Sequence, residues 1–245
     1  ENNAIVAIGG GTDNGCITKL SATGNLIYNA KLNKSGLVAY QDLLLLPKGA
    51  LVAVGGGTIA YGNARITKLD ATGEVEFDKS IGNGQGGYFT KIIMDRHGNY
   101  ITVGVDGSKP AQARITKMSP EGKIIFDKGF GAHNVFNNVL IDEDENIVAI
   151  GGDVGDGQGR AYLVKVDGKG EQQFELSFGK PGAIFEEMLL LEDGSILAMG
   201  GGAYGTGNAS RIAKVNAEGQ VVFDKEYSSV DGKFNAMKVN DLREI

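Results

Sequence analysis

The sequence predicts an all-β protein, a five-bladed β-propeller with four antiparallel strands in each blade. Three observations predict it: a unit of 46 to 49 residues that recurs five times, apolar runs that end in glycine, and no convincing helical period. Short strands rich in β-branched and apolar residues, separated by glycine-containing turns, are typical of all-β proteins. Four-stranded units of this length are typical of propeller blades.

The second strand of each unit is an apolar run that ends in glycine. The five runs are AIVAIGGG (4–11), ALVAVGGG (50–57), NYITVG (99–104), NIVAIGG (146–152) and SILAMGGG (195–202). The units therefore begin near Ile5, Leu51, Tyr100, Ile147 and Ile196, at spacings of 46, 49, 47 and 49 residues. The glycines mark the places where each strand leaves its sheet.

The third and fourth strands are joined by a turn with a fixed pattern of a lysine, a glycine five residues later and an aromatic residue four further on. The five cases are Lys19/Gly24/Tyr28, Lys68/Gly73/Phe77, Lys117/Gly122/Phe126, Lys165/Gly170/Phe174 and Lys214/Gly219/Phe223. Glycine at the end of such a turn indicates a positive φ angle.

The first strand of each unit begins with an aromatic residue that we expect in the core between blades: Tyr40, Phe89, Phe136, Phe185 and Phe234. The last of these opens the segment 234–240, at the C-terminal end of the chain. We therefore expect the ring to close through this segment, which joins the three N-terminal strands and covers their open edge. Blade 1 then combines 234–245 with 1–33, and the other blades span 38–81, 88–130, 135–178 and 184–228, as one domain over 1–245.

The composition excludes several classes of function. Lys and Arg total 24 against 30 Asp and Glu, and a net charge of −6 argues against binding to nucleic acid or an anionic membrane surface. No window approaches the ~18 apolar residues of a membrane span, so no membrane insertion is expected. The single cysteine, Cys16, excludes an intrachain disulfide and a thiolate metal site. We expect a monomer without cofactor or metal ion, processed or excised from a longer chain and located at the cell surface or outside the cell.

The order of strand, double glycine, strand, turn and aromatic residue resembles a kelch-type blade, although the chain has no tryptophan. The run ITKLDATGEVEFDK (66–79) resembles the glycine-rich propeller repeats of bacterial surface and secreted proteins, with phenylalanine in place of the usual tryptophan. The resemblance implies a propeller scaffold. It implies no activity, because propellers carry many unrelated functions.

Two sets of recurring charged residues are interpreted as scaffold. The five lysines lie on the third strands, where their stems cover apolar surface. Arginine recurs at one position of three units, and a four-residue turn places an aspartate opposite each: Arg65 with Asp78, Arg114 with Asp127 and Arg211 with Asp224. The two units that lack the arginine have Cys16 and Tyr162 there, and also lack the aspartate. We therefore predict cross-strand pairs, each worth about 0.2–1 kcal/mol.

The candidate binding site is the channel mouth, where loops leave the second strands and enter the first strands. These loops vary most between units, as recognition loops on a fixed scaffold do. The candidate loop residues are Tyr61, Tyr204, His133, Arg160, Asn63, Asn134 and Asn208, and a polar ring just inside contains Gln41, Thr90, Asn137, Glu186 and Asn235. The favoured function is a non-catalytic module that binds a glycan or a protein at this mouth.

Two alternatives stay open, a glycoside hydrolase and a structural spacer domain. A hydrolase needs an acid and a base or nucleophile, and the acids at this level are Asp42, Glu186 and Glu187. The loop DVGDGQG (153–159) could bind Ca²⁺ but lacks the glutamate and spacing of an EF-hand. His97 and His133 lie far apart in the repeat, which argues against a histidine-based metal site or nucleophile.

Overall fold

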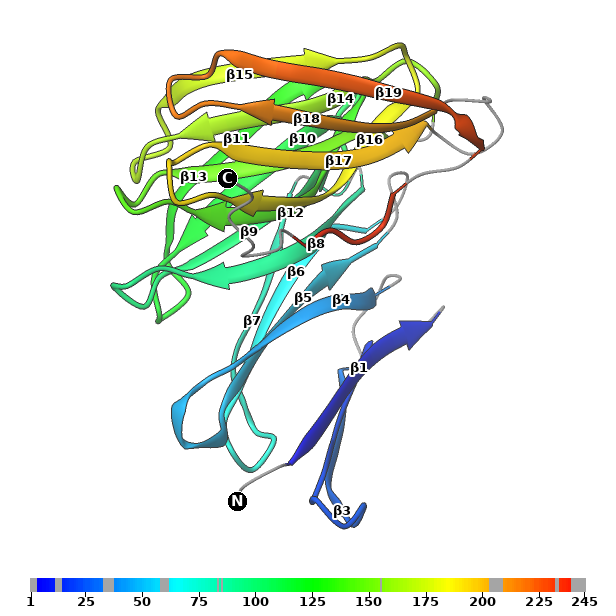
Figure 1. Cartoon of the computed structure of the whole chain (residues 1–245). Coiled ribbons are helices and arrows are strands. Elements are labelled where there is room, and N and C mark those ends of the chain that lie inside the picture. The colour runs from blue at the N-terminus through cyan, green and yellow to red at the C-terminus, as the bar shows by residue number, and fades with distance from the viewer. Residues whose placement is uncertain are drawn as a thin grey trace.

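The computed structural model describes residues 4–11, 15–32, 38–57, 62–82, 84, 86–154, 156–202, 209–231 and 234–238. Within these residues the chain forms nineteen β-strands and one 3-10 turn, η1 (Pro47–Gly49), which confirms the all-β class (Figure 1). The strands belong to two antiparallel sheets, one of 11 strands and one of 8. No helix among the described residues has the length and apolar character that crossing a membrane requires.

Consecutive strands pair into antiparallel meanders, which we number along the chain. Meander 1 contains β1 (Ile5–Gly11), β2 (Gly15–Leu20) and β3 (Leu26–Leu32). Meander 2 contains β4 (Val38–Leu45), β5 (Leu51–Gly56), β6 (Ala64–Leu69) and β7 (Val75–Ile81). Meander 3 contains β8 (Gly87–Met94), β9 (Tyr100–Asp106), β10 (Gln112–Met118) and β11 (Ile124–Ala132). Meander 4 contains β12 (Asn134–Ile141), β13 (Ile147–Asp153), β14 (Ala161–Val166) and β15 (Gln172–Phe178). Meander 5 contains β16 (Ala183–Leu190), β17 (Ile196–Gly202), β18 (Ala209–Val215) and β19 (Val221–Asp231).

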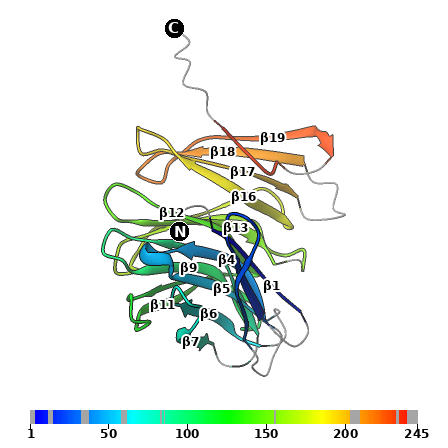
Figure 2. The ribbon, with the colours of Figure 1, turned by 90° about the horizontal axis from the view of Figure 1, so that it is seen from below.

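The meanders are arranged side by side around their first strands, with β4 next to β8, β8 next to β12 and β12 next to β16. Short ladder contacts also join the end of one second strand to the start of the next first strand. The pairs are Gly10 with Ala39, Gly56 with Tyr88 and Gly152 with Ile184. Figure 2 shows the resulting stack of layers. The hairpin turns therefore gather on one side of the molecule, the turn side, and the connecting loops gather on the other.

A β-bulge interrupts the first strand of meanders 2 to 5 directly after its aromatic residue. The residues that the register skips are Gln41, Thr90, Asn137 and Glu186. On the paired second strand the opposing position is always glycine, at Gly55, Gly104, Gly151 and Gly200, and a Cβ atom there would lie 1.9–2.0 Å from a carbonyl oxygen of the first strand. The recurring glycines are thus required by the close approach of two backbones.

The core lies between facing meanders. Phe89 and Ile92 of meander 3 pack on Val52, Val54 and Ile66 of meander 2, and equivalent clusters join the later meanders. The predicted burial of the aromatic residues is confirmed for Tyr40, Phe89, Phe136 and Phe185, which are at most 4% exposed. Burying each such ring is worth roughly 1.5–3 kcal/mol.

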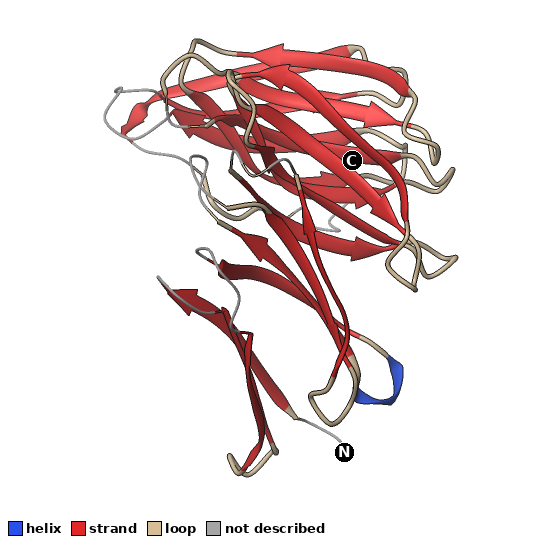
Figure 3. Cartoon of the chain, turned by 180° about the vertical axis from the view of Figure 1, so that it is seen from behind, coloured by secondary structure: helices blue, strands red, loops and turns tan. Residues whose placement is uncertain are grey.

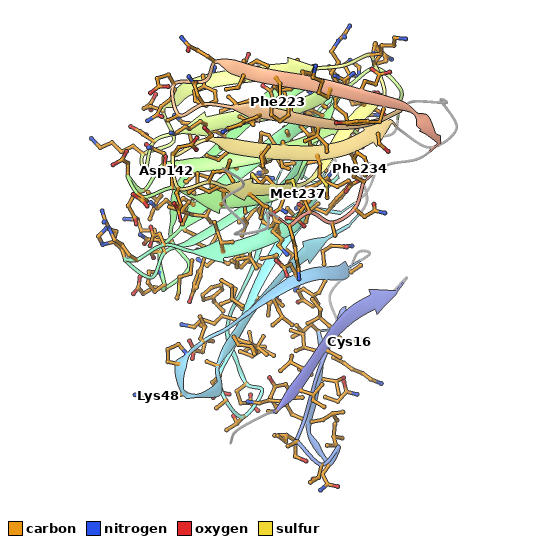
Figure 4. The ribbon with its side chains drawn as sticks, in the orientation of Figure 1. Cys16, Lys48, Asp142, Phe223, Phe234 and Met237 are labelled. Carbon is orange, nitrogen blue, oxygen red and sulfur yellow. The ribbon has the colours of Figure 1, made fainter. Side chains whose placement is uncertain are left out.

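The recurring lysines connect the turns on the turn side. The Lys117 ammonium lies 3.0 Å from Asp95 Oδ2 and donates to the Gly168 carbonyl of the next meander. Lys165 lies 2.9 Å from Asp142, which Figure 4 labels on this side. The interpretation of these lysines as scaffold is confirmed.

The C-terminal segment differs from the prediction of a strand over 234–240. Residues 234–238 belong to no strand, and 239–240 lie outside the described residues. The Phe234 N–H donates to the Gly200 carbonyl at 3.2 Å, and its ring packs edge-on against Tyr227. These contacts hold the segment on meander 5, so within the described residues β1 pairs with β2 and β4 but not with this segment. Figure 3 shows meander 1 at a distance from meander 5.

Candidate functional site

The loops opposite the turn side form a border, which we call the loop rim: the described residues of 57–63, 82–86, 107–111, 132–134, 154–160 and 179–182. Backbone hydrogen bonds connect loops of successive meanders. His133 N–H donates to the Ala111 carbonyl at 2.7 Å, Val154 N–H donates to the His133 carbonyl at 3.1 Å, and Gly182 N–H donates to the Gly159 carbonyl at 2.6 Å. The rim is therefore fixed by contacts between meanders as well as by its own turns.

The loop 153–160 is folded around a buried carboxylate. Asp153 is 5% exposed, and its oxygens accept the backbone N–H groups of Gly157, Gln158 and Gly159 at 2.8–3.1 Å. An aspartate that binds nearby backbone in this way fixes a loop without a metal ion. Among the described residues, no three His, Cys, Asp or Glu side chains are grouped so that they could hold a metal.

His133 is placed at the rim by an unusual backbone conformation, with φ of 62° in the turn between β11 and β12. Its Nδ1 lies 2.6 Å from Asp156 Oδ2, and both side chains are partly exposed. Burial raises the pKa of Asp156, but hydrogen bonds from His133 and the Gln158 N–H outweigh it, so the pKa lies below its usual value. The pair presents a fixed, charged group to solvent.

The other predicted loop residues are distributed along the rim. The Arg160 guanidinium donates to the Gly179 carbonyl, and its backbone N–H donates to Asn134 Oδ1 at 3.2 Å. Asn63 Oδ1 accepts the N–H of Gly84 at 2.7 Å. Tyr61, Tyr204 and Asn208 lie outside the described residues. The structure thus brings together His133, Asn134 and Arg160 of the candidate set.

The predicted polar ring connects consecutive first strands. Thr90 Oγ1 donates to the Phe136 carbonyl at 2.7 Å, and Asn137 Nδ2 donates to the Phe185 carbonyl at 3.0 Å. In each case the acceptor is the aromatic residue just before the bulge of the next meander. The equivalent residues Gln41 and Asn235 are exposed, and Glu186 is half-buried.

A second polar ring follows the bulges directly; two of its members, Asp42 and Glu187, were named from the sequence as candidate acids, but the ring itself was not identified. Asp42 Oδ2 accepts the Ile92 N–H at 3.0 Å and lies 3.6 Å from the Lys91 ammonium. Asn138 Nδ2 donates to Glu187 Oε1 at 2.9 Å. The signal was present, because a polar residue follows the bulge residue in each of the four meanders. Of the three carboxylates considered for hydrolysis, Asp42 and Glu187 are therefore bound by the neighbouring strand. Asp42 lies on β4, and Glu186 and Glu187 lie on β16, with β8 and β12 between them.

The predicted arginine–aspartate pairs are confirmed in their partners and corrected in their register. Arg65 Nε donates to Asp78 Oδ1 at 2.6 Å, Arg114 Nε to Asp127 Oδ1 at 2.6 Å, and Arg211 pairs with Asp224. Leu69 pairs with Val75, one residue beyond the expected partner, and a bulge after Lys68 adds one more residue, so that Asp78 lies opposite Thr67 rather than Arg65. The long arginine reaches it diagonally. Where tyrosine replaces arginine, the Tyr162 hydroxyl donates to Glu175 at 2.6 Å.

No protein-family profile matches the sequence, and no curated protein matches it significantly. Among solved structures, the chain is similar to a protein of unknown function from Bacteroides caccae, with 14% identity and a TM-score of 0.53 over 94% of this chain and 84% of that one. It is also similar to virginiamycin B lyase from Staphylococcus aureus (12% identity, TM-score 0.56, 86% of this chain and 62% of the lyase). A third similar structure is the WD40 domain of Neurospora crassa Pan2 (8% identity, TM-score 0.55, 91% of this chain and 65% of that chain). At these identities the likeness concerns the fold alone, which is propeller-like.

Proposed function

We propose that the chain is a non-catalytic recognition module that binds a glycan or a protein at the loop rim. The observation that carries the proposal is the interlocking of the rim loops across meanders, which holds His133, Asp156 and Arg160 in fixed positions at the surface. A preformed polar surface loses little conformational entropy on binding. The sequence resemblance to repeats of surface and secreted proteins supports a location at the cell surface or outside the cell.

In this proposal, two of the acids considered for a hydrolase have structural roles, because groups of the neighbouring strand bind them. Asp42 receives the Ile92 N–H, and Glu187 receives the Asn138 amide. Thr90 and Asn137 of the polar ring likewise bind carbonyls of the next strand. Ligand contacts then come from the rim rather than from the two rings below it.

We also propose that the meanders are the five blades of a ring that the segment 234–240 closes against β1. Gly9 supports this closure. It occupies the position of Gly55, Gly104, Gly151 and Gly200, yet among the described residues the nearest atom to a Cβ built on Gly9 is Cys16 Sγ, at 3.7 Å. In the register of the other meanders Phe234 lies opposite Gly9 and Met237 opposite Ala7. In the closed ring, glycine is then required at position 9 for the same reason as at its four equivalents, the close approach of the first strand.

The recognition module is tested by screening the purified chain on a glycan array and a protein array. The double variant His133→Ala/Arg160→Ala should lower the signal of the bound ligand at least fivefold. The matched control is Arg96→Ala/His97→Ala, which removes the same two residue types from an exposed hairpin turn on the turn side and should leave binding unchanged. Equal signals from both variants, or no ligand on either array, would contradict the proposal. Turnover of a bound glycan that Glu186→Gln abolishes would instead favour the hydrolase.

A further inference from the structure

A cavity of about 490 Å³ lies between the end of β7 in meander 2 and strands β9 to β11 of meander 3. Its walls include Ser80, Gly82, Asp106, Ser108, Arg114 and Asp127. The volume is within the range of small-ligand sites, roughly 300–1,000 Å³. Gly82 and the residues after Asp106 belong to the loop rim, so the cavity adjoins the proposed recognition surface.

The polar groups of the cavity are held in place by the scaffold. The Arg114 side chain is 7% exposed; its Nε and Nη2 donate to Asp127, and its Nη1 donates to the Ile81 carbonyl at 3.1 Å. These bonds use three of the five N–H groups of the guanidinium. Three hydrogen bonds converge on Asp106 Oδ1, from Ser108 N–H, Ser108 Oγ and Gln112 N–H, and its Oδ2 takes no part in them. Fixed donors and acceptors therefore lie side by side.

The charges of the cavity favour a neutral ligand. The Arg114 charge is compensated by Asp127, and Asp106 adds a negative charge. Lys128 also lines the cavity, but its ammonium is engaged 2.8 Å from Glu171 Oε1 of meander 4. A site without surplus positive charge disfavours phosphates and carboxylates, whereas paired carboxylate acceptors and guanidinium donors suit adjacent hydroxyl groups.

The cavity differs from its equivalent in meander 5 at the residue opposite the arginine. In the ladder between third and fourth strands, Gly129 lies opposite Arg114, whereas Glu226 lies opposite Arg211. Glu226 accepts a hydrogen bond from Arg211 Nη2 at 2.5 Å and occupies that space. Gly129 carries no side chain and lines the cavity, and the flexible Gln112 side chain lies beside it, with its Oε1 2.5 Å from a Cβ built on Gly129.

We propose that this cavity binds one neutral sugar residue of a glycan. The inference rests on the proposed recognition function and specifies both the ligand class and the cavity in which the ligand binds. Hydroxyl groups of the sugar bind the Arg114 guanidinium and the Asp106 and Asp127 carboxylates.

The test is saturation-transfer NMR and calorimetric titration with methyl glycosides of glucose, galactose, mannose and N-acetylglucosamine, with methyl glucuronide as the charged comparison. We expect the wild-type chain to bind at least one neutral glycoside more tightly than the glucuronide. Gly129→Glu, which copies meander 5, and Ser80→Trp, from the opposite wall, should each weaken that binding at least tenfold. The matched control Ser177→Trp changes the exposed residue at the same register position of β15 and should stay within twofold. Unchanged unfolding midpoints show that the variants are folded.

Equal binding by the wild type and both cavity variants would overturn the proposed sugar-binding site. So would a wild-type chain that binds none of the neutral glycosides. These results are distinguishable from failure of the recognition function. If the arrays still show a ligand whose binding depends on His133 and Arg160, the recognition function is supported and only the sugar-binding cavity is ruled out. If the arrays show no ligand, both proposals fail.

Discussion

At the scale of single residues, burial decides how much each of the repeated ion pairs contributes to the free energy of unfolding. Lys117 and Lys214 occupy equivalent positions of their meanders, and each pairs with the aspartate of a hairpin turn. Lys117 is 9% exposed and its partner Asp95 is 1% exposed, whereas Lys214 and Asp193 are 23% and 58% exposed. A buried charge that loses its partner costs far more than an exposed one, because water cannot replace the lost contact.

We therefore predict that Lys117→Met lowers the free energy of unfolding by about 3–5 kcal/mol and Lys214→Met by less than ~1 kcal/mol. Urea unfolding at pH 7 measures both. Equal losses from the two variants would contradict the role given to burial.

The same prediction has a pH dependence. Burial raises the pKa of Asp95, but hydrogen bonds from Asn99 and Lys117 outweigh it and hold the pKa below its usual value. A carboxylate with a lowered folded pKa stabilises the protein above its unfolded pKa, near ~3.9, and this contribution is lost as the pH falls through the folded value. The difference between wild type and Lys117→Met should therefore shrink below about pH 4. A difference that stays constant down to pH 3 would show that lost packing, not the charge, causes the effect.

At the scale of the strand, the repeated glycine and the bulge belong to one structural feature, the close approach of the first and second strands. The Cβ of an alanine at Gly151 would lie 1.9 Å from the Val135 carbonyl oxygen, which backbone movement alone can relieve. We predict that Gly151→Ala lowers the free energy of unfolding by at least ~3 kcal/mol, measured by urea unfolding. Gly11→Ala is the control, because no atom of the part of the chain that the structure describes lies within 4 Å of a Cβ at that position. A Gly151→Ala chain as stable as Gly11→Ala would contradict the close approach.

The repeat and its backbone irregularities explain which features the sequence could predict and which it could not. Strand order, the aromatic core and the partners of Arg65 and Arg114 follow from the repeat. The pairing of Leu69 with Val75 and the bulge after Lys68 each shift the register by one residue, and neither is visible in a pattern of residue types, so Asp78 was misplaced by two positions. Thr90 and Asn137 were correctly placed on their strands, but their bonds to the carbonyls of the next meander depend on the same kind of irregularity. The contact between His133 and Asp156 depends on how two loops fold, which no repeat encodes.

At the scale of the whole molecule, the question is whether the repeat ends in an arc or a ring. Counting only the residues that the structure describes, meander 1 has three strands, and its Gly9 lacks the close backbone neighbour of its four equivalents. Phe234 already lies against Gly200, where the next first strand begins in the other meanders. In a closed ring Asn235 can donate to the Tyr40 carbonyl, as Thr90 donates to that of Phe136.

Ring closure predicts a specific coupling between the two ends of the chain. Gly9→Ala should destabilise the full chain by an amount similar to Gly151→Ala, at least ~3 kcal/mol, because the closing segment meets the new methyl group. Deletion of residues 234–245 should itself destabilise the chain, and in the deleted chain Gly9→Ala should cost less than ~1 kcal/mol. Urea unfolding of the four chains measures this coupling as a double-mutant cycle. If Gly9→Ala is as mild in the full chain as in the deleted one, the segment 234–240 does not pair with β1 and the molecule is an arc.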